Sequence, residues 1–262
     1  MARQRLGQHF LSGPGWQKRI LETLPRGSDE VWIEIGPGHG EMTRILAAEG
    51  RRLIAIEADP RLAANLQETV RAQPREWPGV EVVSGDVLEL DLAKLAGGKF
   101  RVYGNLPYYI TSPILHQLFG CADQIASIHV VMQLEVAERV VARPGRREYG
   151  YLSAACQFYT RPKFALKIPP GAFRPPPKVK SALVQMDLPG ERANLGIADE
   201  DKFLKFIQLC FGHKRKTLRN NLLAVASDQR IHEALASCGL RSDARAEQLT
   251  LTHFASLFAA IA

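Results

Sequence analysis

Short apolar segments alternate with helix-like segments over the first half of the chain, and this alternation restricts the fold more than any other feature. The segments that we predict as strands lie at residues 31–35, 52–57, 80–84, 100–103 and 125–132. The helical segments between or after them lie at residues 41–49, 60–73 and 135–142. Alternating strands and helices build a parallel sheet with helices on both faces, so we predict an α/β fold.

The pattern changes at Pro189, which we interpret as a domain boundary. Before it, residues 165–168 and 181–187 are predicted as two final strands. After it, residues 199–262 contain only helical signals, with apolar residues at helical spacing such as Phe203, Phe206, Ile207 and Cys210. We therefore predict an α/β domain over residues 1–188 and a small all-helical domain over residues 189–262.

Basic residues gather in three segments that contain no acidic residue. The chain has a net charge of +7 at pH 7. Residues 1–21 hold four Lys or Arg, and residues 149–186 and 202–227 hold six each. A single block of this kind is typical of an ordinary solvated face, but three blocks together favour a polyanionic partner such as nucleic acid.

Several classes of protein are disfavoured. The four cysteines lie at least 28 residues apart and form no C-x-x-C pair, so we expect neither a metal site nor disulfides. The longest uncharged stretch, residues 102–122, contains prolines and polar residues that argue against a membrane span. The basic N-terminal segment lacks a secretory apolar core. We expect a cytoplasmic protein without a membrane partner and, by default, a monomer.

A glycine-rich turn, Glu34–Gly40, follows the first predicted strand and precedes a helix. Its glycines, including Gly36 and Gly38, let the backbone approach a ligand closely. Glu57 ends the next predicted strand, where a carboxylate can accept hydrogen bonds from ribose hydroxyls. The turn alone is as often a plain turn as a ligand site. Together with Glu57 it favours a nucleotide-like ligand, although G-x-G-x-G differs from the G-x-G-x-x-G of dinucleotide binders.

Gly85-Asp86-Val87 follows the third predicted strand. Asp86 is expected at the same carboxyl edge of the sheet, where ligands bind in open α/β folds, and it can accept a hydrogen bond from an adenine amino group. A lone aspartate in this position is otherwise an ordinary turn residue. Asp86 gains meaning only beside the other strand-end motifs.

The segment Asn105-Leu106-Pro107-Tyr108 follows the fourth predicted strand and is the most informative motif. An exocyclic adenine amine is a poor nucleophile, because its lone pair is delocalised into the ring. The Asn105 oxygen and a carbonyl of Leu106 or Pro107 can accept its two N–H groups, and Tyr108 offers a face for the base. Pro107 fixes the loop. Positioning then supplies most of the catalysis, and no strong general base is needed.

With these motifs in place, the chain closely resembles the ribosomal RNA adenine dimethyltransferases, which modify two adjacent adenosines near the 3′ end of small-subunit (16S) rRNA. The resemblance covers nearly the whole chain. Beyond the four strand-end motifs it rests on Gly7–Leu11, Gln133–Val136, Tyr149–Ser153, Pro169–Val179, Lys214–Leu222 and Arg245–Glu247.

The resemblance implies a Rossmann-like, class I S-adenosylmethionine-dependent sheet with a small C-terminal helical domain, no metal, and small-subunit rRNA and the pre-small ribosomal subunit as partners. The implied donor-binding residues are His9, Leu11, Glu34, Gly36, Gly38, Glu57, Asp86, Val87 and Asn105. The implied catalytic residues are Asn105, Leu106, Pro107, Tyr108 and Phe173. The implied contacts with RNA phosphates are Lys178, Lys214, Arg215, Lys216 and Arg219.

Phe173 is implied as a second aromatic that would sandwich a flipped base against Tyr108. From the sequence alone, a core residue that anchors the proline-rich segment is an equally good interpretation. The chain also departs from the family pattern at three positions: His9 and Tyr109 stand where the family often has Asn, and Lys214 replaces a usual Arg.

Two other functions stay open at this point. The large-subunit (23S) rRNA methyltransferases of the antibiotic-resistance type share an Asn-x-Pro-Tyr-type loop, although Pro169–Val179 and Lys214–Leu222 fit the small-subunit group better. A ribosome-assembly factor whose methylation is incidental would also use the basic blocks. A nicotinamide-dependent oxidoreductase is disfavoured by the spacing of the glycine-rich turn.

Overall fold

The computed structural model describes residues 9–26, 30–213 and 216–261. The chain divides into two compact units. The first unit contains residues 1–137 and 162–188, and the second contains residues 138–161 and 189–262. Residues 138–161, which the sequence pattern places in the first domain, therefore group with the helices that follow residue 189.

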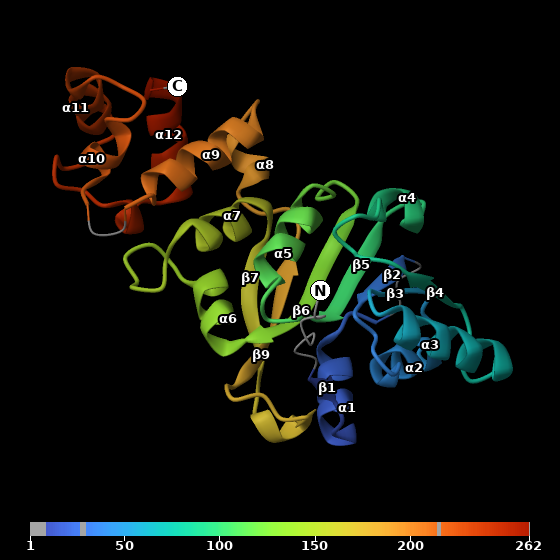
Figure 1. Cartoon of the computed structure of the whole chain (residues 1–262). Coiled ribbons are helices and arrows are strands. Elements are labelled where there is room, and N and C mark those ends of the chain that lie inside the picture. Colours follow the sequence, from blue (N-terminus) through green and yellow to red (C-terminus); the bar gives the residue numbers. More distant parts are fainter. Residues whose placement is uncertain (1–8, 27–29, 214–215, 262) are drawn as a thin grey trace, which may run out of the picture. The chain divides into compact units, whose positions relative to one another are not determined.

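A seven-stranded sheet forms the centre of the first unit (Figure 1). Its strand order is β4 (Val80–Ser84), β3 (Leu53–Glu57), β2 (Val31–Ile35), β5 (Phe100–Asn105), β6 (Ile125–Gln133), β9 (Ser181–Asp187) and β7 (Arg161–Ile168). The pairs among β2 to β6 are parallel, as predicted.

Strand β9, whose direction the sequence pattern does not predict, runs antiparallel to β6. The reason lies in where the chain enters β9. Gln133, the last residue of β6, is paired with Ser181, the first residue of β9. A strand that begins beside the end of its neighbour has to run back along it.

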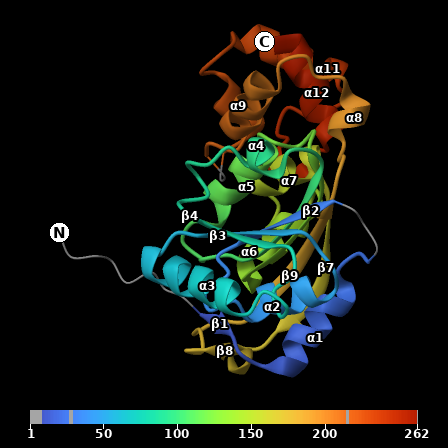
Figure 2. The ribbon, with the colours of Figure 1, turned by 90° about the vertical axis from the view of Figure 1, so that its right-hand side faces the viewer.

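Helices cover both faces of this sheet, and Figure 2 shows α1 (Pro14–Thr23), α2 (Glu41–Ala48) and α3 (Pro60–Ala72) on one side. Helices α4 (Leu92–Ala96) and α5 (Thr111–Phe119) lie on the other side. Local sequence explains where α3 and α4 begin. The side chains of Asp59 and Asp91 accept hydrogen bonds from the N–H groups of Arg61 and Lys94, which caps the first turn of each helix.

Two short strands stand outside the main sheet. Strand β1 (Phe10–Leu11) pairs antiparallel with β8 (Phe173–Arg174), which follows the 3₁₀ turn η1 (Pro170–Ala172). Leu11 lies opposite Phe173 in this pairing, and both side chains belong to the apolar core between α1, α2 and the sheet. The proline-rich segment thus holds the N-terminal residues against the first unit. Helix α6 (Leu134–Val141) follows β6 directly.

The second unit consists of helices: α7 (Tyr151–Tyr159), α8 (Arg192–Leu195), α9 (Glu200–Cys210), α10 (Leu218–Leu222), α11 (Asp228–Ser237), the 3₁₀ turn η2 (Ala246–Gln248) and α12 (Leu251–Ile261). Aromatic rings form its core. The Phe158 ring of α7 lies 5.3 Å from that of Phe203 in α9, which in turn lies 5.5 Å from Phe258 in α12. These contacts explain why residues 138–161 group with this unit.

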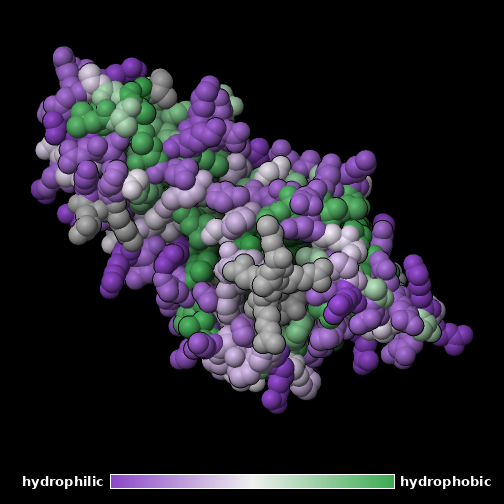
Figure 3. Space-filling view, in the orientation of Figure 1, coloured by the Kyte–Doolittle hydropathy of each residue, from purple (hydrophilic) through white to green (hydrophobic). Residues whose placement is uncertain are grey.

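On the face drawn in Figure 3, hydrophilic residues predominate and hydrophobic ones show in small areas. In the described part of the chain, no helix combines the length and the apolar character that a bilayer crossing requires.

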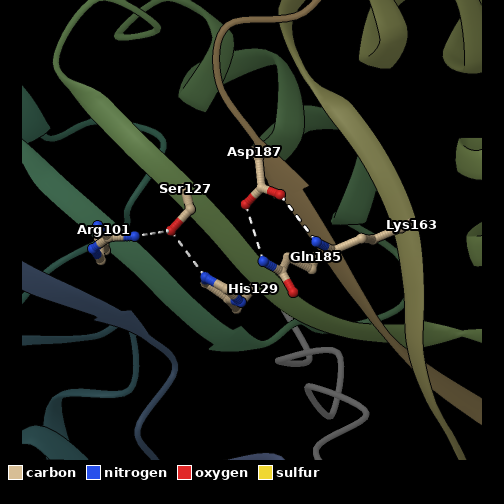
Figure 4. Close-up of polar contacts among 6 residues, drawn as sticks. All are labelled: Arg101, Ser127, His129, Lys163, Gln185 and Asp187. Atoms are coloured by element: carbon tan, nitrogen blue, oxygen red, sulfur yellow. Dashed lines mark hydrogen bonds and ion pairs between the residues drawn. The ribbon is translucent and has the colours of Figure 1, made fainter. Parts of the chain in front are cut away.

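Figure 4 shows two polar clusters on the sheet: Arg101 of β5 with Ser127 and His129 of β6, and Lys163 of β7 with Gln185 and Asp187 of β9. The Arg101 guanidinium donates to Ser127 Oγ at 2.8 Å, and Ser127 Oγ lies 2.9 Å from His129 Nε2. His129 is fully buried. Burial disfavours the charged imidazolium and lowers the pKa of His129 to about 4, despite the nearby carboxylate of Asp187.

This burial predicts an acid-sensitive fold. The unfolded chain protonates His129 near pH 6.5, whereas the folded chain does so only near pH 4, so its contribution to stability is complete above about pH 6.5 and is lost towards pH 4. The loss amounts to about 1.4 kcal/mol per pH unit within this window. We expect His129→Gln to flatten the decline of Tm between pH 6.5 and 4 in thermal denaturation.

The matched control is His232→Gln, because His232 is exposed on α11. That variant is expected to keep the wild-type slope. A His129→Gln protein whose Tm falls as steeply as the wild type would contradict the assignment of this acid sensitivity to His129.

Candidate active site

A pocket opens at the carboxyl ends of β2, β3, β4 and β5, the edge at which ligands bind in sheets of this kind. Its empty space, including the open mouth, is about 780 Å³. The sequence-predicted residues that line it are His9, Gly36, Gly38, Glu57, Asp86, Val87, Asn105, Leu106, Pro107 and Tyr108.

The glycine-rich turn forms one wall of this pocket. Gly36 and Gly38 have φ angles of +70° and +59°, which residues with a side chain rarely adopt. A Cβ atom on Gly38 would lie 2.5 Å from the Phe10 ring. At Gly36 the nearest non-adjacent atom to an added Cβ would be Asn105 O, at 3.9 Å, which is an ordinary van der Waals contact and no clash.

Glu57 stands at the end of β3 and is only 3% exposed. Its Oε2 accepts a hydrogen bond from Gly38 N at 3.0 Å, and its Oε1 accepts one from Asp59 N at 2.9 Å. A carboxylate has about four acceptor sites, so each oxygen can accept a further hydrogen bond from a ligand in the pocket. The carboxylate is therefore fixed in orientation and still has capacity for hydroxyl groups.

Asp86 lies beyond the end of β4 on the same edge. Its Oδ1 accepts a hydrogen bond from Leu88 N at 3.0 Å, an Asx-type turn that orients the carboxylate. Gly85 N donates to Glu57 O at 2.9 Å, which ties this loop to the end of β3. The buried Val87 side chain supplies an apolar part of the pocket wall.

The loop after β5 forms the opposite wall. Asn105 Nδ2 donates a hydrogen bond to His9 O at 2.7 Å, and Leu106 N donates to Val131 O at 3.0 Å. The Tyr108 hydroxyl lies 2.7 Å from Ser181 Oγ. Partial burial raises the pKa of Tyr108, so its ring remains neutral. The loop thus brings an amide, backbone carbonyls and an aromatic face to one place.

Phe173 does not line the pocket. Its side chain is 1% exposed and packs in the core, where β1 covers it through the Leu11–Phe173 pairing. The ring beside Tyr108 is that of His9, with ring centroids 5.7 Å apart. The geometry therefore agrees with the interpretation of Phe173 as a core residue. The Leu11 side chain also points into the core.

Glu34 also lies outside the pocket. It alternates with Ile35 along β2, so it points to the opposite face of the sheet, where it is 2% exposed. Burial, together with the nearby carboxylates of Glu41 and Glu57, raises the pKa of Glu34 to about 8. The turn that lines the pocket therefore follows a carboxyl group that is mostly protonated at neutral pH.

Several pocket residues were not predicted from the sequence: Phe10, Ile35, Ile56, Ala58, Gly85, Tyr109, Ile110 and Ile114. Phe10 belongs to the Gly7–Leu11 motif, and its ring also lies 4.6 Å from that of His39. Tyr109 is 60% exposed at the rim. The apolar pocket residues could not be identified from the sequence, because their residue types also occupy ordinary core positions of strands and helices.

The predicted RNA contacts lie in both units. Lys178 is exposed in the first unit, and Lys216 is exposed in the second. Arg219 is partly exposed and forms an ion pair with Asp228 at 2.5 Å. Lys214 and Arg215 lie outside the described residues. Across residues 9–26, 30–213 and 216–261, no group of His, Cys, Asp or Glu side chains could hold a metal ion.

Comparison with known sequences gives a consistent result. The family described as "Ribosomal RNA adenine dimethylase" matches residues 1–262. The chain is 40% identical to ribosomal RNA small subunit methyltransferase A of Koribacter versatilis, over 97% of this chain and 92% of that protein. It is 43% identical to the protein of the same name from Acidobacterium capsulatum, over 97% of this chain and 89% of that protein.

Solved structures share the fold over nearly the whole chain. A dimethyladenosine transferase from Plasmodium falciparum has a TM-score of 0.80 at 23% identity, covering 95% of this chain and 96% of that chain. The 23S rRNA methyltransferase ErmE has a TM-score of 0.72 at 28% identity, covering 96% of this chain and 99% of that chain. The fold is therefore that of class I methyltransferases with C-terminal helices.

The buried Glu34 predicts a fold that weakens as the pH rises from about 4.5 to about 8. Its folded-state pKa lies above its usual value of 4.5, so its contribution to stability is complete below about pH 4.5 and is lost as the pH rises through about 8. Each unit of this shift corresponds to about 1.4 kcal/mol. We expect Glu34→Gln, which stays neutral, to lose less stability than the wild type between about pH 4.5 and 8 in urea denaturation.

Glu49→Gln is the control, because Glu49 is exposed at the end of α2. It is expected to follow the wild-type pH dependence. The assignment is wrong if the Glu34→Gln variant and the wild type have parallel stability curves.

Proposed function

The chain belongs to the ribosomal RNA adenine dimethylase family, and we propose that it dimethylates N6 of two adjacent adenosines in the 3′-terminal hairpin of small-subunit rRNA. The single observation that carries the proposal is the loop after β5, where Asn105, a backbone carbonyl and Tyr108 line one pocket with Glu57 and Asp86. The same site thus offers groups for a methyl donor and for an adenine amine.

The choice of small-subunit rRNA follows the relatives. The proteins named ribosomal RNA small subunit methyltransferase A are 40% and 43% identical to this chain, compared with 28% for the 23S rRNA methyltransferase ErmE. This difference favours the small subunit over the resistance-type reaction. The gathering of Glu57, Asp86 and Asn105 in one pocket favours catalysis over a role only in ribosome assembly.

The pocket residues fit S-adenosylmethionine, the methyl donor that this family implies. When bound, that molecule supplies an electrophilic methyl group on a sulfonium. We assign the ribose hydroxyls to Glu57, whose carboxylate retains acceptor capacity, and the adenine amino group to Asp86. The methionine part is assigned to the pocket wall at Gly36, where the backbone carries no side chain.

The target amine is assigned to the loop after β5. Asn105 Oδ1 and the Leu106 carbonyl accept its two N–H groups, which directs the nitrogen lone pair towards the donor side of the pocket, whereas Pro107 O already accepts Ile110 N and Thr111 Oγ1. The Tyr108 ring supports the flipped base by stacking. These residues hold the reacting atoms in position, and positioning supplies most of the rate enhancement.

The second unit and the proline-rich segment are assigned to rRNA. Lys216 and Arg219 lie at the beginning of α10, and Lys178 lies on the exposed part of residues 168–179. Lysine and arginine at such exposed positions contact phosphates and give affinity without sequence readout. The pre-small ribosomal subunit is the proposed partner, with base specificity left to the pocket.

The first test is to incubate the protein with labelled S-adenosylmethionine and small subunits that lack this modification, and to map the labelled nucleotides. We expect dimethyladenosine at two adjacent adenines near the 3′ end of the small-subunit rRNA. Label on large-subunit rRNA instead would show that the protein catalyses the resistance-type reaction. Tight subunit binding without label on either rRNA would favour the assembly-factor alternative.

Asn105→Ala is expected to lower methyl transfer by at least 100-fold, because the target amine loses an acceptor that holds it in position. Subunit binding, measured by sedimentation with labelled rRNA, should remain within about threefold of the wild type. If binding and transfer decline together, Asn105 acts in RNA binding and not in the transfer step.

Glu57→Gln is expected to weaken donor binding by roughly 10- to 100-fold in calorimetry, since hydrogen bonds to a charged group contribute about 1.5–3 kcal/mol. Glu81→Gln is the control, because Glu81 is an exposed residue of the neighbouring strand β4. Equal donor affinity in the Glu57→Gln variant and the control would reject the ribose assignment.

A further inference from the structure

The N-terminal arm, residues 9–12, lies against the loop that carries Asn105. Its carbonyl at His9 accepts the 2.7 Å hydrogen bond from Asn105 Nδ2. Behind this contact the arm is fixed by the β1–β8 pairing and by Ser12 N, which donates to Ala172 O at 3.0 Å. Gln17 Nε2 also donates to Leu11 O at 2.8 Å.

This contact selects one orientation of the Asn105 side-chain amide. A carbonyl oxygen only accepts, so the group that faces His9 O has to be the NH₂ end of the amide. The opposite orientation would bring two oxygens together and lose the hydrogen bond. Because the amide is planar, fixing Nδ2 against the arm directs Oδ1 away from it. Oδ1 is the only atom of this side chain that can accept an N–H of the target amine.

The side chain of His9 holds its carbonyl in this place. His9 Nδ1 lies 2.7 Å from Pro175 O and, facing a carbonyl, it carries the proton and donates. The ring also lies beside Tyr108, with centroids 5.7 Å apart and planes tilted by 30°. The imidazole is thus attached both to the proline-rich segment and to the loop after β5.

We propose that His9 is a positioning residue for methyl transfer: its N–H bond to Pro175 fixes the arm so that the His9 carbonyl orients the Asn105 amide with Oδ1 towards the target amine. The inference rests on the proposed function and deepens it, because it adds a residue to the same site. His9 acts through Asn105 and needs no contact with the reacting atoms.

The two contacts of the imidazole can be separated by substitution. Asn Nδ2 and His Nδ1 are separated from Cα by the same number of bonds, so His9→Asn keeps a donor for Pro175 O and removes the ring. His9→Phe keeps a ring beside Tyr108 and removes the donor. His9→Asp places an acceptor against the Pro175 carbonyl, where it is repelled.

The kinetic experiment measures kcat and KM with unmethylated small subunits, together with donor Kd by calorimetry. We expect kcat of His9→Asn to stay within about threefold of the wild type, and kcat of His9→Phe and His9→Asp to fall at least tenfold. Because His9 lines the donor pocket, kcat is measured at saturating donor and the donor Kd of each variant is determined beside it. Activity retained by His9→Phe and lost by His9→Asn would overturn the proposal in favour of ring stacking.

A second measurement does not depend on activity. In ¹⁵N-labelled protein without substrate, the Asn105 side-chain NH₂ signals are those that disappear in Asn105→Asp. We expect them to keep their chemical shifts in His9→Asn and to move in His9→Phe and His9→Asp. Unmoved signals in all three variants, or donor Kd values that rise as much as kcat falls, would overturn the proposal.

The outcome also separates this inference from the proposed function. A wild-type protein that labels no adenosine in small-subunit rRNA refutes the proposed function, while the NMR comparison still decides whether His9 orients Asn105. A wild type that dimethylates its substrate, with three variants of equal kcat, refutes the role of His9 and leaves the proposed function intact.

Discussion

The carboxylate of Glu57 joins the loops from which the pocket is built. It accepts one backbone N–H from the glycine-rich turn after β2 and another from the start of α3. The backbone carbonyl of Glu57 accepts a third hydrogen bond, from Gly85 N after β4. Gly36 N adds a bond to Ile56 O at 2.9 Å. The ends of three neighbouring strands are therefore fixed to one another before any ligand arrives, and the other pocket residues are placed relative to this frame.

Most of the sheet could be predicted from the sequence, because parallel strands buried on both faces appear as short continuous apolar runs. The direction of β9 could not, since Ser181–Asp187 has the same pattern in either direction and only its entry beside the end of β6 decides. The grouping of residues 138–161 was equally hidden. It depends on contacts such as Phe158 with Phe203, and neither residue differs locally from other core positions.

The pocket was predictable where polar residues follow strands, as at Asp86 and Asn105, because strand ends meet at one edge. Glu34 belongs to the glycine-rich motif but does not line the pocket. Side chains alternate between the two faces along β2, so Glu34 lies on the same face as Trp32, away from the pocket. The position of Phe173, in contrast, could not be predicted from any local pattern. Its place beneath the N-terminal arm depends on the pairing with Leu11, between residues far apart in the chain.

The second unit is assembled from two stretches of chain, 138–161 and 189–262. During synthesis, α7 emerges before α9 and α12 exist, so the Phe158 ring lacks its contact with Phe203 until that residue is added. At roughly 5–20 residues per second the delay is on the order of seconds. A nascent chain ending near residue 189 exposes an apolar helix face, which makes that interval the natural point of chaperone engagement and the place where truncated products become prone to aggregate.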